Sequence, residues 1–261
     1  MQNKITIITV TLNAKSDLIK TIHSVQNQTY RNFEHIIKDG YSTDGTKEIN
    51  FNDFENTYFH TIKDIGIYDA MNQGFEFAKG DLIMFLNAGD LLYSNDILML
   101  INNSFKKQLY SSCLVGYTIQ TKLKNKKSYL IHGYGWPYKL LPFIQFPHPS
   151  FVLRKNIAEQ IKPLFDNRLK IAADYKQQLI MRGKGLFNPI YMDFIITEMP
   201  IGGASTKDSL SYLKGFFEVC KFSLRIYKLQ SIYILGLKIF LHFYRKNINK
   251  STIKKILLKK R

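Results

Sequence analysis

Residues 4–90 alternate between apolar runs with strand character and segments whose apolar residues recur at helical spacing. The strand runs are KITIITVTLN, FEHIIKDG, YFHTIKD and DLIMFLNAGD. Two helices are expected between them, over AKSDLIKTIHSVQNQ and GIYDAMNQGFEFAKG, the second closed by Gly80, and YSTDGTKEI reads as a turn that opens a further helix. This rhythm predicts a mostly parallel, doubly wound α/β sheet.

Each of the four strand runs ends in, or just before, a polar residue. These residues are Asn13, Asp39, Asp64 and Asp90. Because parallel strands end at the same edge of a sheet, the four side chains are expected to meet there. Ligands of doubly wound sheets bind beyond this edge, so the pattern predicts a binding site.

The stretch MFLNAGDLLY, residues 84–93, has two interpretations. Gly89, Asn87 and Asp90 are residue types that form tight turns, so the stretch fits a simple chain reversal. A carboxylate at the end of a strand is also well placed to bind a hard divalent cation, which prefers oxygen ligands. The convergence of polar strand ends favours a site.

The remainder of the first 206 residues continues as strand and helix segments. A helix is expected over ILMLINNSFKK, followed by strands over SCLVGYTIQT and KSYLIHGY, and GYGWPYKLLPFIQFPHPS reads as a loop. FVLRKNIAEQI, AADYKQQLIMRGKG and FNPIYMDFIITEMP then complete the core. We expect one domain over residues 1–206.

Composition supports a folded protein in a reducing compartment. Of 261 residues, 45% are hydrophobic and 14% aromatic, which is enough for a core. The two cysteines are too few for a disulfide framework. No export signal and no uncharged apolar run of about 18 residues is seen, so a cytoplasmic location is expected.

The positive charge is concentrated at the end of the chain. Residues 207–261 contain 14 lysines and arginines against two acids, and so hold 12 of the 17 net positive charges. Lys221, Arg225 and Lys228 recur at helical spacing among aromatic and aliphatic residues. This pattern predicts a basic amphipathic helical appendage that could lie on an anionic membrane surface. Packing on the core, or a contact between two copies of the chain, are the alternatives.

By these motifs the chain resembles glycosyltransferase family 2, the inverting enzymes with the GT-A fold, over residues 4–206. The resemblance rests on the stretch from ITIITVTLN to YSTDGT, on GIYDAMNQGFEFAKGDLIMFLNAGD, on HPSFVLRKN, on PLFDNRLKIAADYKQQLIMRG and on GGAS, in this order. Within the family it resembles the enzymes that build bacterial surface polysaccharides, such as colanic-acid-type side-chain enzymes. The Gln-x-x-Arg-Trp motif of processive synthases is absent, which favours transfer of a single sugar.

The resemblance implies roles for the strand ends in binding a nucleotide-sugar donor, expected to be linked to UDP. Thr11 and Asn13 match the positions that border the nucleoside, and Asp39 matches the carboxylate that binds uracil. Asp64 matches a polar residue near the base or ribose. The family often has a second acid after the first, where this chain has Gly40.

The NAGD stretch stands where the family has Asp-x-Asp. The resemblance therefore implies that Asp90 binds a divalent cation, Mn²⁺ or Mg²⁺, with Asn87 in place of one acid on the donor side. Such an ion neutralises the charge that develops on the leaving nucleoside diphosphate. An amide is a weaker ligand than a carboxylate, so the diphosphate would have to hold more of the ion.

Three further residues are candidates for the chemistry. Asp174 in AADYKQQL matches the general base that takes the proton of the acceptor hydroxyl, although a carboxylate at a helix start is also a good cap. His148 in FPHPSF matches a histidine on the acceptor side, or is an ordinary loop histidine. Asp69 would lie near the sugar pocket, or is a first-turn acid of its helix.

The sequence leads to one principal function and two rivals. We expect transfer of one sugar, with inversion, to a glycan or lipid-linked glycan acceptor in surface polysaccharide synthesis, at the inner face of the cell membrane. A nucleotidyltransferase of similar fold would normally have a glycine-rich loop after the first strand, and TVTLNAKSD has none. A basic nucleic-acid-binding protein would not place three acids at its site edge, so no nucleic-acid partner is expected. Self-association is left open.

Overall fold

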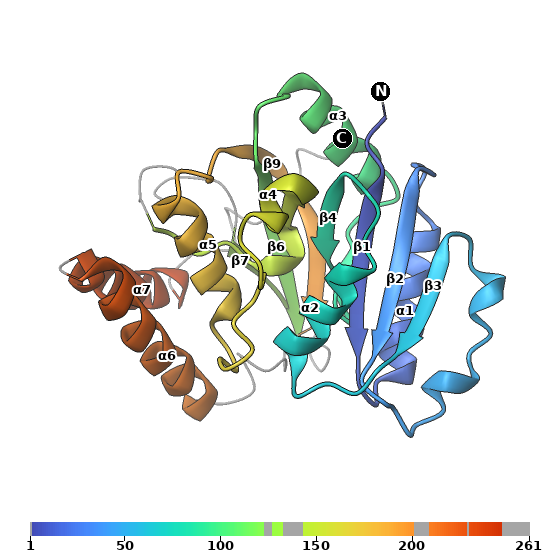
Figure 1. Ribbon diagram of the computed structural model, residues 1–261, viewed down its shortest axis with the longest axis horizontal. Coiled ribbons are helices and arrows are strands. Elements are labelled where there is room, and N and C mark those ends of the chain that lie inside the picture. The colour runs from blue at the N-terminus through green and yellow to red at the C-terminus, as the bar shows by residue number, and fades with distance from the viewer. Residues whose placement is uncertain (1, 123–126, 133–142, 201–208, 229, 247–261) are drawn as a thin grey trace.

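The computed structural model describes residues 2–122, 127–132, 143–200, 209–228 and 230–246. Its centre is a nine-stranded mixed sheet in the order β3-β2-β1-β4-β8-β6-β9-β5, with β7 paired to β6 (Figure 1). The strands are β1 Ile5–Thr11, β2 Phe33–Asp39, β3 Thr57–Thr61, β4 Leu82–Phe85, β5 Leu91–Leu92, β6 Cys113–Lys122, β7 Lys127–His132, β8 Phe151–Arg154 and β9 Pro189–Pro200.

The first four strands are parallel, as the strand–helix rhythm predicted. β1 pairs with β2 and β4, and β2 pairs with β3, all in parallel. β8 then runs antiparallel between β4 and β6, which makes the sheet mixed. Both faces of β1 are buried, because β1 has a strand on either side and helices cover both faces of the sheet.

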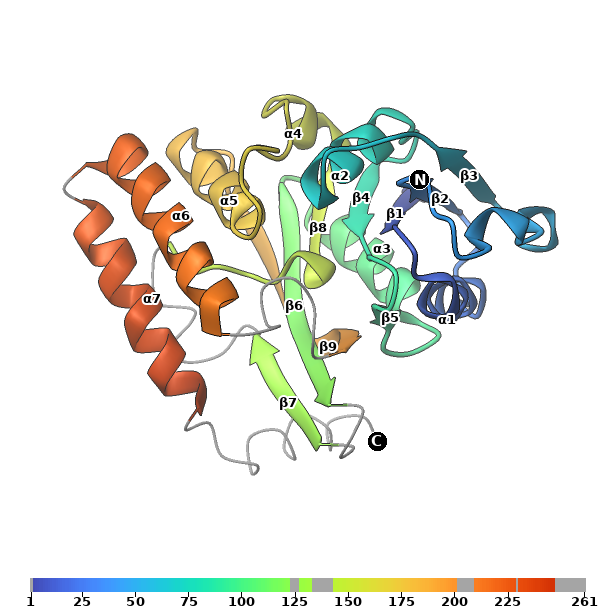
Figure 2. The same ribbon diagram turned by 90° about the horizontal axis from the view of Figure 1, so that it is seen from below.

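Helices cover both faces of the sheet. α1 (Lys15–Gln26) and α3 (Ile97–Lys107) lie on one face, and α2 (Ile67–Glu76), α4 (Lys155–Glu159) and α5 (Ala173–Gly183) lie on the other (Figure 2). Alternate residues of β1 divide accordingly. Ile5 and Ile7 pack in the same core cluster as the α3 side chains, whereas Ile8 and Val10 pack with those of α2. The prediction of a doubly wound α/β fold is confirmed.

One predicted helix is absent. The stretch after β2 forms only two short 3-10 helices, Thr46–Glu48 and Phe51–Asp53. Asp44 accepts hydrogen bonds from the backbone N–H and the hydroxyl of Thr46, and Gly45 takes a left-handed φ of +83°. Asn50 is extended, so the chain cannot continue as an α-helix. In addition, α2 ends at Glu76, four residues before Gly80, whose N–H is bound by Glu34.

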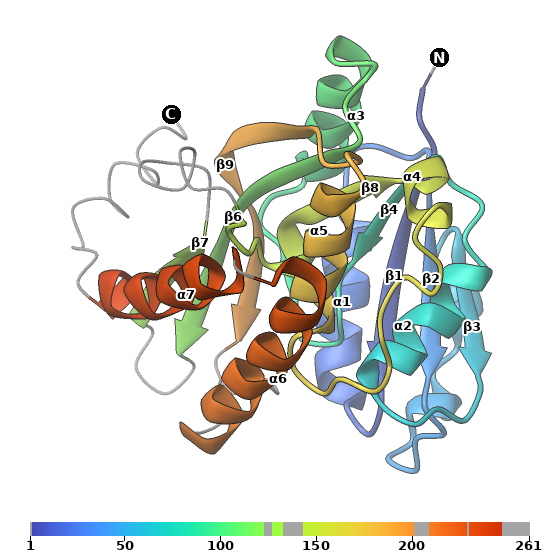
Figure 3. The same ribbon diagram turned by 60° about the vertical axis from the view of Figure 1, so that its left-hand side comes forward.

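Two C-terminal helices pack beside α5. They are α6 (Ser209–Tyr227) and α7 (Gln230–Lys246), and Figure 3 shows both in front of the sheet, at the end of the molecule that carries α5. A separate apolar cluster joins them to α5, with members Ala172, Tyr175, Leu179, Val219, Phe222 and Ile234. The Tyr227 hydroxyl also donates to the Leu179 carbonyl. No helix of the described ranges is long and apolar enough to cross a membrane.

Candidate active site

The polar strand ends meet at one edge of the sheet. Thr11 and Asp39 are register partners at the ends of β1 and β2, and Asp39 is in turn the partner of Thr61 at the end of β3. In Figure 1 the arrowheads of these three strands point to the lower edge of the view. The edge predicted from the sequence is therefore present.

Asp39 and Asn13 hold the loop after β2 in place. The buried Asp39 carboxylate accepts hydrogen bonds from the N–H groups of Tyr41 and Ser42 and from the Thr61 hydroxyl. Asn13 Oδ1 accepts from the Thr43 N–H at 2.8 Å. The two side chains thus fix the backbone at the edge of the sheet.

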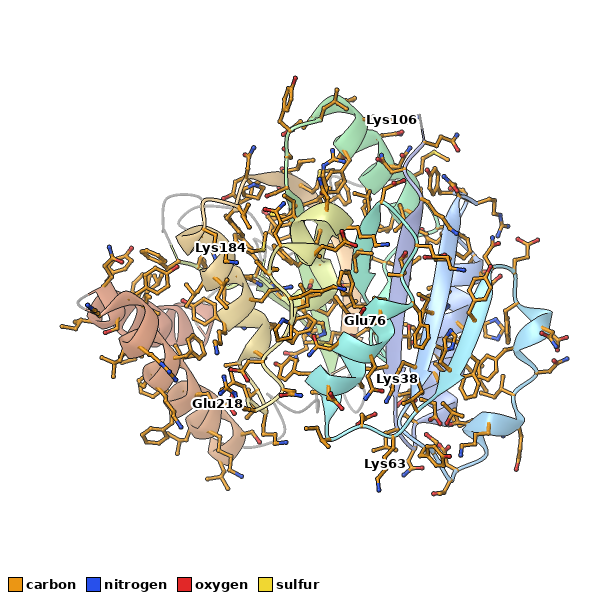
Figure 4. The ribbon with its side chains drawn as sticks, in the orientation of Figure 1. Lys38, Lys63, Glu76, Lys106, Lys184 and Glu218 are labelled. Carbon is orange, nitrogen blue, oxygen red and sulfur yellow. The ribbon has the colours of Figure 1, made fainter. Side chains whose placement is uncertain are left out.

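Asp64 forms a buried ion pair that the sequence did not indicate. Its carboxylate binds the ammonium group of Lys38, a side chain with no exposed surface although it lies on β2. Figure 4 labels Lys38 near the same lower edge. Asp64 also accepts from the Gly66 N–H at 3.1 Å, just before α2. An added Cβ at Gly40 would lie 2.7 Å from Asp64 Oδ2, which explains why no side chain follows Asp39.

The NAGD segment is a tight turn attached to α1. The Asp90 N–H donates to the Asn87 carbonyl at 2.9 Å, and Gly89 adopts a φ of +99°. The Thr21 hydroxyl accepts from the Gly89 N–H and donates to the Asp90 carbonyl, both at 2.9 Å. The turn interpretation is therefore correct for the backbone, and it fixes the direction of the Asp90 side chain.

The side chains of this turn are buried in a way that fits a cation. Burial raises the pKa of Asp90 to about 8, because an ionised carboxylate is poorly solvated there. Asn87 Oδ1 is buried and has no hydrogen-bond partner among the described residues. A charged carboxylate and an unsatisfied amide oxygen both gain from a nearby positive ion.

His148 lies beside this pair, at the start of a 3-10 helix (His148–Ser150). Its Nε2 atom is 3.1 Å from Asn87 Nδ2 and 4.0 Å from Asp90 Oδ2. Because the amide nitrogen donates, Nε2 accepts and carries no proton in this arrangement. Burial lowers the pKa of His148, and the negative charge of Asp174 opposes that shift.

The protein alone supplies few ligands for a metal. Among the described residues, no group of three or more histidine, cysteine or acidic side chains could hold an ion. Asp90 and Asn87 would provide one carboxylate and one amide oxygen. The remaining ligands of a Mg²⁺ or Mn²⁺ ion would come from a diphosphate and from water, as is usual where such ions bind with a nucleotide.

Asp174 is placed by a second set of contacts, on α5. It is 6% exposed and accepts a hydrogen bond from Gln145 Nε2 at 3.2 Å. The Tyr68 hydroxyl lies 3.4 Å from Asp174 Oδ1 and donates to the Ile171 carbonyl at 2.7 Å. Burial raises the pKa of Tyr68 well above its usual value, so it remains a neutral donor.

Glu218, on α6, holds the backbone that leads to Asp174. Its carboxylate accepts three N–H groups, from Lys170 at 2.7 Å, Ile171 at 3.0 Å and Ala172 at 2.9 Å. The N-cap residue of α5, Ala172, has no side chain that could cap the helix. Glu218 was not among the residues predicted from the sequence, although it is the one acid of α6.

The other predicted residues have structural contacts or lie outside the described ranges. Asp69 accepts from the Ile65 N–H at 3.1 Å and from Gln73 Nε2 at 3.0 Å, as a first-turn acid does. Thr11 Oγ1 is buried with no partner among the described residues. The GGAS motif and part of the predicted loop before His148 lie outside the described residues. The roles of Asp69, Thr11 and the other site residues stay predictions.

Comparison with known proteins identifies the family. Residues 6–174 match the family Glycosyl transferase family 2. An uncharacterized glycosyltransferase of Mycobacterium tuberculosis is 27% identical over 222 residues, which cover 81% of this chain and 80% of the relative. A PGL/p-HBAD biosynthesis glycosyltransferase of Mycobacterium bovis is 41% identical over 97 residues, but the match covers only 35% of this chain and 38% of that relative.

Solved structures share the fold at low sequence identity. TarS residues 1–349 of S. aureus, in complex with UDP-GlcNAc, has a TM-score of 0.68 and 16% identity, covering 94% of this chain and 74% of that one. The mannosyltransferase PcManGT of Pyrobaculum calidifontis, in complex with GDP-Man and Mn²⁺, has a TM-score of 0.66 and 15% identity, covering 93% and 70%. The chain therefore belongs to glycosyltransferase family 2 and has the GT-A fold, which decides against the nucleotidyltransferase and nucleic-acid-binding alternatives.

Proposed function

We propose that this glycosyltransferase moves one sugar from a UDP-linked donor to a hydroxyl of a glycan or lipid-linked glycan, with inversion, in the synthesis of a surface polysaccharide. The observation that carries the proposal is the grouping of Asp90, His148 and Asp174. Asp90 lies 4.0 Å from His148, and the charge of Asp174 acts on the same ring. Two carboxylates with different surroundings can serve the two halves of a displacement.

The strand ends would bind the donor. In this proposal Thr11, Asn13, Asp39 and Asp64 border the nucleoside, and the diphosphate lies toward Asn87 and Asp90. Thr11 Oγ1 and Asn87 Oδ1 are buried polar atoms without partners among the described residues, and a bound ligand would satisfy them. A divalent ion held by Asp90 and Asn87 would neutralise negative charge on the leaving diphosphate.

Asp174 would act on the acceptor. The acceptor oxygen attacks the anomeric carbon from the face opposite the diphosphate, the bond to the diphosphate breaks, and the hydroxyl proton passes to Asp174. Gln145 and Tyr68, which contact the carboxylate, would orient it. Asp69, whose oxygens already accept three hydrogen bonds, would support α2 rather than touch the acceptor.

The test is the variant Asp174→Asn, which keeps the shape of the side chain and removes the base. Transfer should fall by about 10²-fold or more, because general bases contribute about 10²–10⁴. Binding of UDP, measured by calorimetry with Mn²⁺, should be unchanged. Asp69→Asn is the matched control and should retain transfer. A fully active Asp174→Asn enzyme would refute the assignment.

A further inference from the structure

The outer face of α6 carries an exposed apolar row. Its members are Leu210, Leu213, Phe217 and Leu224, which are 58%, 49%, 66% and 55% exposed. The steps between them are three, four and seven residues, so the four side chains lie along one side of the helix. The opposite side, with Val219 and Phe222, is the side that packs on α5. The apolar row is therefore not needed for the contact with α5.

A basic row runs beside the apolar row. Lys214, Lys221 and Arg225 are exposed and lie on the adjacent strip of the helix surface, and the exposed Lys228 directly follows the helix. The one acid of α6, Glu218, has its carboxylate bound to three backbone N–H groups before α5, so the basic residues outnumber the acids on this part of the helix. In α7, Ile232 and Phe240 are also exposed, by 72% and 52%.

We propose that the outer face of α6 docks onto an anionic membrane surface. An apolar row flanked by lysine and arginine suits the boundary between lipid head groups and acyl chains, where the apolar side chains insert and the cations meet lipid phosphates. A second copy of the chain is a poorer partner, because an isologous contact would bring two basic rows together. An anionic surface complements the same charges.

This docking would bring the catalytic helix to the membrane. The inner side of α6 holds the start of α5 through Glu218, so one helix connects the proposed membrane surface with the segment that carries Asp174. A lipid-linked acceptor would then lie in the plane that the enzyme occupies. This step rests on the proposed function, whereas the docking itself does not require it.

Vesicle co-sedimentation of the full chain tests the docking. The protein should bind vesicles of phosphatidylcholine with about a quarter phosphatidylglycerol, and pure phosphatidylcholine vesicles much less. The double variant Lys221→Glu/Arg225→Glu should weaken binding at least about 25-fold, because each basic residue near the surface contributes about fivefold. Phe217→Ser should weaken it about tenfold. High salt should weaken wild-type binding.

Matched controls separate the α6 face from net charge. Lys106 and Lys107 are exposed at the end of α3, far from α6 (Figure 4), and Leu109 is 67% exposed nearby. Lys106→Glu/Lys107→Glu and Leu109→Ser should bind vesicles like the wild type. Equal losses in both sets, or no binding of wild type to anionic vesicles, would overturn the proposal. A dimer in solution that Phe217→Ser dissociates would instead assign the face to self-association.

A second readout keeps this proposal apart from the proposed function. Hydrolysis of a nucleotide sugar without vesicles should be the same in wild type and in the α6 variants, because the changed residues lie outside the site. Loss of vesicle binding with normal hydrolysis would support docking. Normal vesicle binding by a chain that neither transfers nor hydrolyses any sugar would leave docking in place and remove the proposed function.

Discussion

Replacing Glu218 by alanine should destabilise the fold and slow transfer together. The substitution removes the acceptor of three backbone N–H groups ahead of α5. A hydrogen-bonded charged group contributes about 1.5–3 kcal/mol, and its favourable place near a helix N-terminus adds about 0.3–1 kcal/mol. Glu218 is half-buried, so water can reach part of the freed backbone and the loss should be about 2–3 kcal/mol. For a chain of this size that lowers Tm by roughly 4–12 °C.

Thermal unfolding and steady-state kinetics measure the two effects. We expect kcat to fall about tenfold with little change in KM for the donor, because the start of α5 carries Asp174 and not the donor edge. Glu218→Gln retains an oxygen acceptor and should recover part of both losses. Glu159→Ala removes an exposed carboxylate 3.9 Å from Lys155 and should change stability by less than about 1 kcal/mol. A Glu218→Ala enzyme with wild-type Tm and kcat would refute this reasoning.

Three further predictions concern buried charges. Burial lowers the pKa of His35 to about 3, so below pH 6.5 the unfolded chain binds a proton at this residue and the folded chain does not. Lowering the pH therefore favours unfolding of the wild type but not of His35→Gln. In urea titrations the unfolding free energy of the wild type, relative to that of His35→Gln, should fall by about 1.4 kcal/mol per pH unit from pH 6.5 downward. Asp64→Ala leaves Lys38 buried without its partner and should cost about 3–5 kcal/mol of unfolding free energy in chemical denaturation, while Asp53→Ala, at an exposed position, should cost little. Burial raises the pKa of Asp90 to about 8, so between about pH 4 and pH 8 this carboxyl is ionised in the unfolded chain and protonated in the metal-free fold, and rising pH lowers the stability of that fold. Asp90→Asn should therefore raise Tm at pH 8 without metal. The same variant should abolish Mn²⁺-dependent UDP binding in calorimetry. An Asp90→Asn protein that binds UDP and Mn²⁺ normally would exclude the carboxylate as a ligand.

The sequence predicted those features that depend on local pattern. The apolar runs that became β1, β2 and β4 are buried along their whole length, and their polar ends meet because parallel strands end together. The NAGD stretch posed a choice between a turn and a site, but the two are compatible. The backbone forms the turn, and the same turn buries Asp90 and the Asn87 Oδ1 atom beside His148.

The features that were missed depend on contacts distant in the sequence. Lys38 and Asp64 are 26 residues apart, and a lysine within a strand gives no sign of its partner. Glu218 binds backbone N–H groups 46 to 48 residues away. Helical periodicity predicts which face of a helix is apolar, but it does not predict which distant N–H groups a carboxylate will bind. The expected helix after β2 failed for a local reason. Asp44 binds Thr46 and Gly45 turns left-handed, which competes with helix initiation.

The crowding at Gly40 constrains the order in which this site can change by mutation. An acid at position 40 would place its Cβ 2.7 Å from Asp64 Oδ2 and a second negative charge beside the Lys38–Asp64 pair. An acid at this position is therefore incompatible with Asp64 in its present position. Introducing an acid at position 40, in evolution or by design, first requires that Asp64 be shortened or redirected. That step alone leaves Lys38 without its partner. Positions 38, 40 and 64 should consequently be exchanged together. A single substitution at one of these positions should destabilise the protein, whereas the triple exchange should be tolerated.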